Sequence, residues 1–143
     1  MSHLITTNVG QAVQLSVWRT YLNAGIAAGA IRVRLFKNNF VPTKDTVRAD
    51  FTQADFNGYA LKTLTNPFNA VTTTAADYAQ IQSPDVLNWQ PSDGLAPNTI
   101  YGYWLEDDTP TVYWCEKFDA PVDMTDATKQ LNLICRYTAK SEY

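Results

Sequence analysis

Apolar residues recur at helical spacing near the start of the chain. The recurring residues, four positions apart, are Val9, Val13, Val17 and Tyr21. Four positions are close to one helical turn, so this pattern predicts an amphipathic helix over residues 9–22. The next segment, AGIAAGA at residues 24–30, sets two glycines among small residues and predicts a connector. We therefore expect an N-terminal arm, residues 1–29, built from a short helix and this connector.

After the connector, apolar and polar residues alternate with the period of a β-strand. IRVRLF, residues 31–36, predicts a strand with one dry face and one solvated face that carries Arg32 and Arg34. Further short β-branched or aromatic runs, separated by Asn, Pro, Gly and Asp, are GYALKTL, AQIQ, VLNW, NTIYGYWLED, TVYWCEKF and QLNLICRYTA. This spacing predicts a mainly β fold, an antiparallel sandwich or barrel-like domain over residues 30–139.

A β-hairpin is predicted at residues 100–118, where two aromatic runs flank a cluster of turn residues, Asp107 to Pro110. The preceding residue, Glu106, completes the acidic triplet Glu106, Asp107 and Asp108. We interpret this triplet as the solvated tip of the hairpin. A calcium site is the alternative, because carboxylate oxygens suit hard cations.

Length and charge restrict the class of protein. The 143 residues correspond to a single domain, residues 1–143, with 45% hydrophobic residues to supply its core. The 11 basic residues do not cluster and are outnumbered by 14 acidic ones, which argues against nucleic acid as a partner. No apolar run approaches the roughly 20 residues that span a bilayer, and the N-terminus lacks the pattern of an export signal. We expect no membrane partner and synthesis in the cytoplasm.

The segment ADFTQADFNGYA, residues 49–60, repeats a carboxylate-aromatic pair after five positions. Neither a helix nor a strand brings residues five apart together, so the repeat predicts a compact turn, capped at Thr52 and left-handed near Asn57-Gly58, whose two rings enter the core. A glycosidase dyad or a calcium loop is the alternative use of the two carboxylates. The predicted turn and core residues are Asp50, Phe51, Asp55, Phe56, Gly58 and Tyr59.

Catalytic and metal-binding patterns are sparse. The single histidine, His3, is a poor base for a nucleophile, and no GxSxG, HExxH, GxGxxG or P-loop pattern occurs. Cys115 and Cys135 lack a CxxC partner, and each lies in a strand-like run, so we expect thiols rather than a disulfide. The sequence thus predicts a protein that is not an enzyme and that uses no cofactor and no metal.

Aromatic residues make up 13% of the chain. Trp and Tyr are enriched at protein interfaces, so the tryptophans are the candidate interface residues. Burial in the core is the alternative for most of these rings. The candidates are Trp18, Trp89, Trp104 and Trp114.

Three segments together resemble small virion structural proteins of tailed bacteriophages and prophages. They are RLFKNNFVPTKDTVRADFTQADFNGYA, IYGYWLEDDTPTVYWCEKFDAPVDM and QLNLICRYTA. They match an LFKN-PT-ADF-ADF-GYA core, a GY strand, an aromatic W-E-F strand and a final β-run, in patches from Ile31 to Ala139. The first 29 residues lie outside the resemblance, and Cys115 within YWCEKF is a departure from the pattern.

The resemblance implies a virion protein that acts by surface complementarity, such as a decoration or cement protein of the capsid. Its expected partners are other virion proteins, the major capsid protein first among them, and further copies of itself in a homo-oligomer. A tail, baseplate or fibre component is the close alternative. A carbohydrate-binding β-sandwich, using exposed aromatic rings as sugar platforms, is the alternative from another class.

Overall fold

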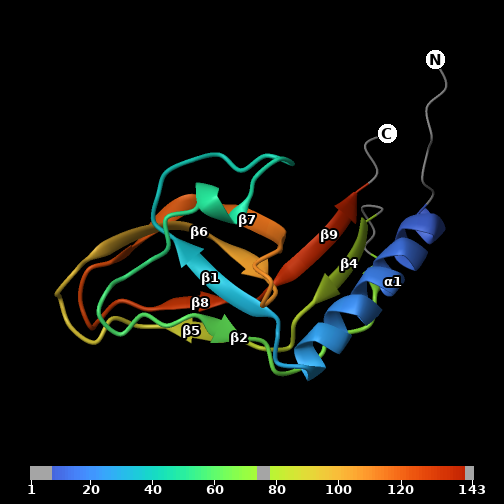
Figure 1. Ribbon diagram of the computed structural model, residues 1–143, viewed down its shortest axis with the longest axis horizontal. Helices are drawn as coiled ribbons and strands as arrows, with labels where there is room; N and C mark the ends of the chain where they lie inside the picture. The colour runs from blue at the N-terminus through green and yellow to red at the C-terminus, as the bar shows by residue number, and fades with distance from the viewer. Residues whose placement is uncertain (1–7, 74–77, 141–143) are drawn as a thin grey trace, which may run out of the picture. The chain divides into compact units, whose positions relative to one another are not determined.

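The computed structural model describes residues 8–73 and 78–140 (Figure 1). The fold is mainly β, with 37% strand and 17% helix, and combines one N-terminal α-helix with several antiparallel sheets. This confirms the fold class predicted from the sequence. The chain divides into two compact units. Whether the two units make one domain stays a prediction.

Unit 1 comprises the described parts of Met1–Ala28, Thr65–Val86 and Ile134–Tyr143. It contains a helix and a three-stranded antiparallel sheet with the order β3-β4-β9. Its elements are α1 (Asn8–Ala27), β3 (Thr72–Thr73), β4 (Tyr78–Gln82) and β9 (Arg136–Lys140). Helix α1 contacts β4 and β9, so the predicted N-terminal arm shares its unit with strands from the middle and the end of the chain.

Helix α1 is longer than the sequence pattern predicted, because it runs through most of the presumed connector. Ala24 accepts a backbone hydrogen bond from the amide of Ala28 at 3.1 Å, which extends the helical ladder. Alanine is the best helix former, and Ile26 is buried, so packing and propensity both favour the extra turn. The chain turns at Gly29, whose φ of 70° is in the left-handed region that ends many helices.

Unit 2 comprises Gly29–Leu64 and Leu87–Leu133. It holds a four-stranded antiparallel sheet with the order β2-β1-β6-β7 and a two-stranded sheet of β5 and β8. The elements are β1 (Arg32–Phe36), the 3₁₀ turn η1 (Arg48–Asp50), β2 (Lys62–Thr63), β5 (Leu87–Trp89), β6 (Asn98–Glu106), β7 (Val112–Met124) and β8 (Leu131–Leu133). The pairing of β6 with β7 confirms the predicted hairpin.

On the two central strands of the four-stranded sheet, β1 and β6, one face is lined by apolar and aromatic side chains. Because side chains alternate along a strand, Val33 and Leu35 of β1 share this face with Tyr103 and Leu105 of β6, which lie opposite them in the register. All four side chains are fully buried. This face supplies the core of unit 2.

The other face is covered by the irregular segment of residues 37–53, which we call the strap (the teal segment in Figure 1). The strap leaves β1 at Lys37 and returns beside it, where the amide of Lys37 donates to the carbonyl of Thr52 at 2.8 Å. Beneath it, Arg34 of β1 lies opposite Trp104 of β6, which lies opposite Cys115 of β7. We call this side of the sheet the strap face.

The sequence prediction that Arg34 lies on a solvated strand face is wrong. Arg34 is buried, with its side chain 11% exposed, because the strap covers the face to which this residue points. Arg32, at the start of the strand, is half-buried.

Candidate functional site

The exposed side of α1 carries the most regular apolar surface in the described part of unit 1. Val13, Val17 and Tyr21 are 59%, 68% and 58% exposed. Their spacing of four residues places them on one side of the helix, and we call these three residues the α1 outer face. The ring of Trp18 stacks against Tyr21, with 5.8 Å between ring centroids and 13° between planes. A contiguous exposed apolar patch of this kind is typical of a contact surface.

The opposite side of α1 explains why this stripe faces outward. The buried residues of the helix are Gln11, Leu15, Leu22 and Ile26. They point toward the sheet side of the helix, which contacts β4 and β9. The sequence shows two apolar stripes on α1, and only one of them can enter the core. The stripe at Val13, Val17 and Tyr21 is therefore left on the surface.

The α1 outer face carries no charge. Arg19 is the single charged residue of the helix, and its guanidinium Nε donates to the carbonyls of Phe68 and Asn69 at 2.8 and 2.6 Å. Asn23 adds a second tie, because its Oδ1 accepts a hydrogen bond from the amide of Phe68 at 2.8 Å. These contacts fix the helix to its unit and direct the one charge away from Val17.

Two of the four candidate interface tryptophans are buried. Trp89 and Trp104 are 2% and 1% exposed, and the indole of Trp89 donates to the carbonyl of Ala60 at 2.8 Å. A ring enclosed in the core cannot contact a partner, so the interface prediction is wrong for these two. Trp18 and Trp114 are half-buried, and their interface role stays a prediction.

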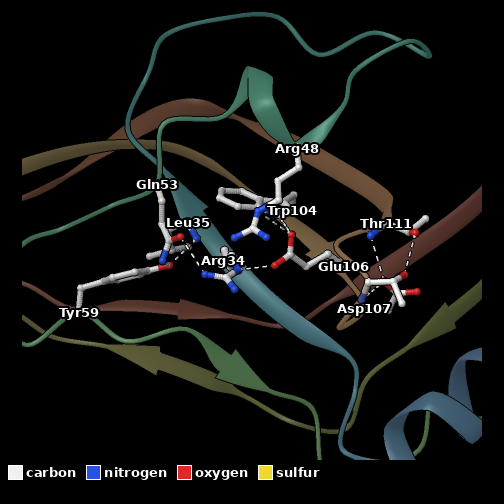
Figure 2. A network of polar contacts seen from close by, with 10 residues as sticks. Arg34, Leu35, Arg48, Gln53, Tyr59, Trp104, Glu106, Asp107 and Thr111 are labelled. Atoms are coloured by element: carbon white, nitrogen blue, oxygen red, sulfur yellow. Dashed lines mark hydrogen bonds and ion pairs between the residues drawn. The ribbon is translucent and has the colours of Figure 1, made fainter.

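Glu106 is the centre of a buried polar network on the strap face, shown in Figure 2. Its side chain is 1% exposed. Its carboxylate accepts a hydrogen bond from Nε of Arg34 and one from the indole Nε1 of Trp104, the latter at 2.8 Å. Arg48, on the strap, approaches the same carboxylate with Nε at 3.4 Å. The interpretation of Glu106 as part of a solvated tip is wrong, because the strap and two arginines enclose it.

The network continues from Arg34 toward the turn after the strap. Nη1 of Arg34 donates to Oε1 of Gln53 at 2.8 Å. The hydroxyl of Tyr59 accepts a hydrogen bond from the amide of Leu35 at 3.1 Å, beside Gln53 (Figure 2). Burial raises the pKa of Tyr59, so this hydroxyl stays protonated. The network joins β1, β6 and the strap through side chains that are otherwise costly to bury.

An aromatic cluster lies beside the polar network. Phe51 of the strap stacks on Trp104, with ring centroids 4.5 Å apart and planes 11° apart. Phe36 and Phe40 pack against Phe51, each at 5.2 Å between centroids. Cys115 packs against the same cluster, and burial raises the pKa of its thiol. No disulfide joins Cys115 to Cys135. The strap is thus attached to its sheet by rings on one side and by charges on the other.

The two carboxylates of the repeated pair are bound to different partners. Oδ2 of Asp50 accepts a hydrogen bond from the amide of Val47 at 2.8 Å and closes the 3₁₀ turn. Asp55 instead binds Nζ of Lys37 at 2.7 Å and Nδ2 of Asn98 at 2.9 Å. The hydrogen bond from Lys37, followed by that from Asn98, lowers the pKa of Asp55. Both carboxylates therefore stabilise the fold through hydrogen bonds to other parts of the chain.

The rings of the repeated pair are both in the core, since Phe51 and Phe56 are buried. The predicted cap at Thr52 is wrong: the turn that a side chain caps is η1, which begins at Arg48, and residues 52–54 run beside β1. Gly58 has a φ of 89°, as the left-handed turn requires, and a Cβ there would lie 3.0 Å from the amide nitrogen of Ser92.

The tip of the β6–β7 hairpin is organised around Asp107. Its Oδ1 accepts hydrogen bonds from the amides of Thr109 and Thr111, both at 2.9 Å, and Oδ2 accepts one from the hydroxyl of Tyr113 at 2.7 Å. Burial opposes ionisation, but the hydrogen bonds from Thr109, Tyr113 and Thr111 outweigh it and lower the pKa of Asp107 to about 2. Asp108 is exposed, so the tip is solvated from this residue onward.

The lowered pKa makes a prediction about stability against pH. The ordinary pKa is 3.8 and the folded value about 2, so the Asp107 contribution is present above 3.8 and is lost as pH falls toward 2. We expect Asp107→Asn to lower the melting temperature at neutral pH, with a difference from the native chain that shrinks as pH falls through this range. Thermal melts of both chains against pH measure it. A difference that does not change with pH would contradict this assignment.

Among residues 8–73 and 78–140, no three His, Cys, Asp or Glu side chains are placed to share a metal ion. His3 lies outside the described residues. Within the described part of the chain, no helix has both the length and the hydropathy to span a membrane.

Sequence reasoning missed the network around Glu106. The alternation of side chains along a strand could have indicated it. Arg34 lies two positions before Phe36, and Glu106 two positions after Trp104, so each charged residue shares a strand face with a buried aromatic residue.

Comparisons with protein-family models, with curated proteins and with solved structures give no match to this chain.

Proposed function

We propose that this chain is a non-enzymatic structural protein of a tailed-phage virion, and that it acts as a decoration protein of the head. It stabilises the shell by contacts with other virion proteins, the major capsid protein first among them. The observation that carries the proposal is the α1 outer face, an uncharged apolar stripe held on a firmly attached helix. The resemblance of the β segments to phage virion proteins supplies the setting.

The resemblance segments have a folding role that supports a contact function. The first forms the end of β1, the strap and the turn at Gly58, and the second forms the β6–β7 hairpin. Three residues of these segments, Phe36, Phe51 and Trp104, form a buried cluster under the strap. Because these residues are buried, they support the fold, and contact with a partner falls to other residues on the surface.

The chemistry of the α1 outer face fits a protein partner. The central part of a protein interface is depleted in charged side chains and enriched in apolar and aromatic ones. Val17, Tyr21 and the neighbouring Trp18 are side chains of this kind. A small patch is sufficient on a symmetric shell, because copies linked in an oligomer bind with the avidity of several contacts.

The proposal predicts that Val17→Glu weakens attachment to particles. Val17 is the most exposed residue of the face, and a carboxylate at this position has to lose its water on binding. We expect affinity to fall by about tenfold or more, as for a central interface residue. The measurement is co-sedimentation of purified variant with virions that lack the native chain.

Ser16→Glu is the matched control. Ser16 is exposed on the same helix but is turned by about 100° from Val17, so it lies off the apolar stripe. This variant should attach like the native chain, and both variants should keep the native melting temperature within a few degrees. Equal attachment of the native chain and Val17→Glu would remove the α1 outer face from the proposal.

A carbohydrate-binding module is the second candidate, and the stacked pair of Trp18 and Tyr21 favours it, because an exposed ring can serve as a platform for sugar. A glycan array separates the two candidates: binding that is lost in Tyr21→Ala supports the module, and an array without binders removes it. A tail or baseplate position shares the contact chemistry of the head proposal, and imaging of particles distinguishes these locations.

A further inference from the structure

Strand β7 forms one edge of the four-stranded sheet in unit 2. It is 13 residues long, whereas β2 at the opposite edge has two. Among the described strands, β7 pairs with β6 on one side and has no neighbour on the other. An edge strand presents backbone N–H and C=O groups that can pair with another extended chain. The outer edge of β7, which no described strand covers, can therefore bind another extended chain as an added strand.

Only the first half of β7 is suited to pairing. The ladder with β6 is regular from Trp114 to Lys117 and shifts register on both sides of this stretch. Pro121, in the second half, has no N–H to donate, and proline is a common protection of sheet edges. Lysine is another such protection, but Nζ of Lys117 is held by Oδ1 of Asn39 at 2.7 Å. In the described part of the chain, neither a proline nor an unbound lysine protects the first half of the edge.

We propose that β7 pairs edge to edge, antiparallel, with β7 of a second copy of this chain, with Cys115 at the two-fold axis. In such a pair, residues at equal distances on either side of the axis face each other. Trp114 then lies opposite Glu116 of the second copy, and Glu116 lies opposite its Trp114. This proposal does not depend on the proposed function.

The charges of β7 select this register. An axis at Glu116 or at Lys117 sets two like charges directly opposite, which destabilises a strand pair. An axis at Trp114 carries the pairing into Val112 and Tyr113, where the register with β6 shifts. An axis at Cys115 opposes two neutral thiols and keeps three successive rows within the regular stretch.

The two thiols give the proposal a specific probe. Cys115 is half-buried, whereas Cys135 is fully buried, and the chain has no other cysteine. In the proposed dimer, directly opposite Cβ atoms lie about 4.5–5.5 Å apart, within reach of a short bismaleimide. We expect this reagent to convert Cys135→Ser, which retains Cys115, into a covalent dimer joined at Cys115. The Cys115→Ser variant should form the dimer without becoming cross-linked.

The experiment combines sedimentation, cross-linking and hydrogen exchange on the full chain. We expect a concentration-dependent dimer and amide protection of residues 113–117 that falls on dilution while that of α1 does not change. Cys115→Asp sets two carboxylates at the axis and should weaken the dimer by about tenfold or more. The exchange measurement needs no variant, so it decides the matter even if Cys115→Asp folds poorly. A monomer at all concentrations, a dimer without the Cys115 cross-link, or protection that changes at α1 instead would each overturn the proposal.

Discussion

Glu106→Gln is expected to lower the free energy of unfolding of unit 2 by about 3–5 kcal/mol, the usual cost of breaking a buried ion pair from one side. The amide can still accept the indole hydrogen bond of Trp104, so the side-chain volume and one contact are kept. Arg34, however, is left as a buried cation whose side chain is 11% exposed, without its carboxylate. Chemical denaturation followed by tryptophan fluorescence measures the loss, because Trp89 and Trp104 are both buried in this unit.

Two further variants separate the buried pair from a general effect of charge. Glu116→Gln removes an exposed carboxylate from β7 and should change the free energy of unfolding by no more than about 0.5 kcal/mol. Replacing Arg34 and Glu106 together by Met removes both charges and should cost less than the sum of the single changes, since neither charge is stranded. Arg48 can then turn to solvent, because its side chain is already 40% exposed. A Glu106→Gln chain as stable as the native one would contradict the role given to the network.

Gly102→Ala is the second large effect that we expect, with a loss of about 3 kcal/mol or more. A Cβ at Gly102 would lie 2.0 Å from the carbonyl oxygen of Glu116 and 2.6 Å from the ring of Phe36. The carbonyl belongs to the backbone of β7, and the ring is enclosed between the sheet and the strap, so neither can move away cheaply. The measurement is again chemical denaturation.

Gly94→Ala is the matched control for this effect. The nearest atom to a Cβ at Gly94 is the carbonyl oxygen of Thr125 at 3.4 Å, an ordinary contact. We expect this variant to unfold at nearly the native denaturant concentration. A loss for Gly102→Ala as small as that of the control would contradict the close packing of β6, β7 and Phe36 around this glycine.

Local patterns were sufficient to predict the fold class. Alternation in IRVRLF and the turn residues between the two aromatic runs depend on near neighbours, and the structure forms both β1 and the β6–β7 hairpin. The sequence pattern places the end of α1 too early, because two glycines in a small-residue segment are typical of a turn. Burial of Ile26, a tertiary contact, decides in favour of the helix there.

The candidate sites depended on contacts that the sequence does not reveal. The burial of Arg34 and Glu106 comes from the strap, whose only regular element is the short turn η1 and whose path no periodicity predicts. The same holds for Trp104: its sequence context predicts an interface residue, but Phe51 stacks on its ring in the structure. Conversely, α1 has two apolar stripes, and the sequence does not show which of them is buried. The strands packed against α1 bury one stripe, which leaves Val17 exposed on the other.

Cryo-electron microscopy of virions from the phage or prophage that encodes this chain tests the central claim most directly. We predict density for the chain on the head, with Val13, Val17 and Tyr21 of α1 in contact with a neighbouring protein. Particles that lack the chain, or that carry it with the α1 outer face turned to solvent, would contradict the claim.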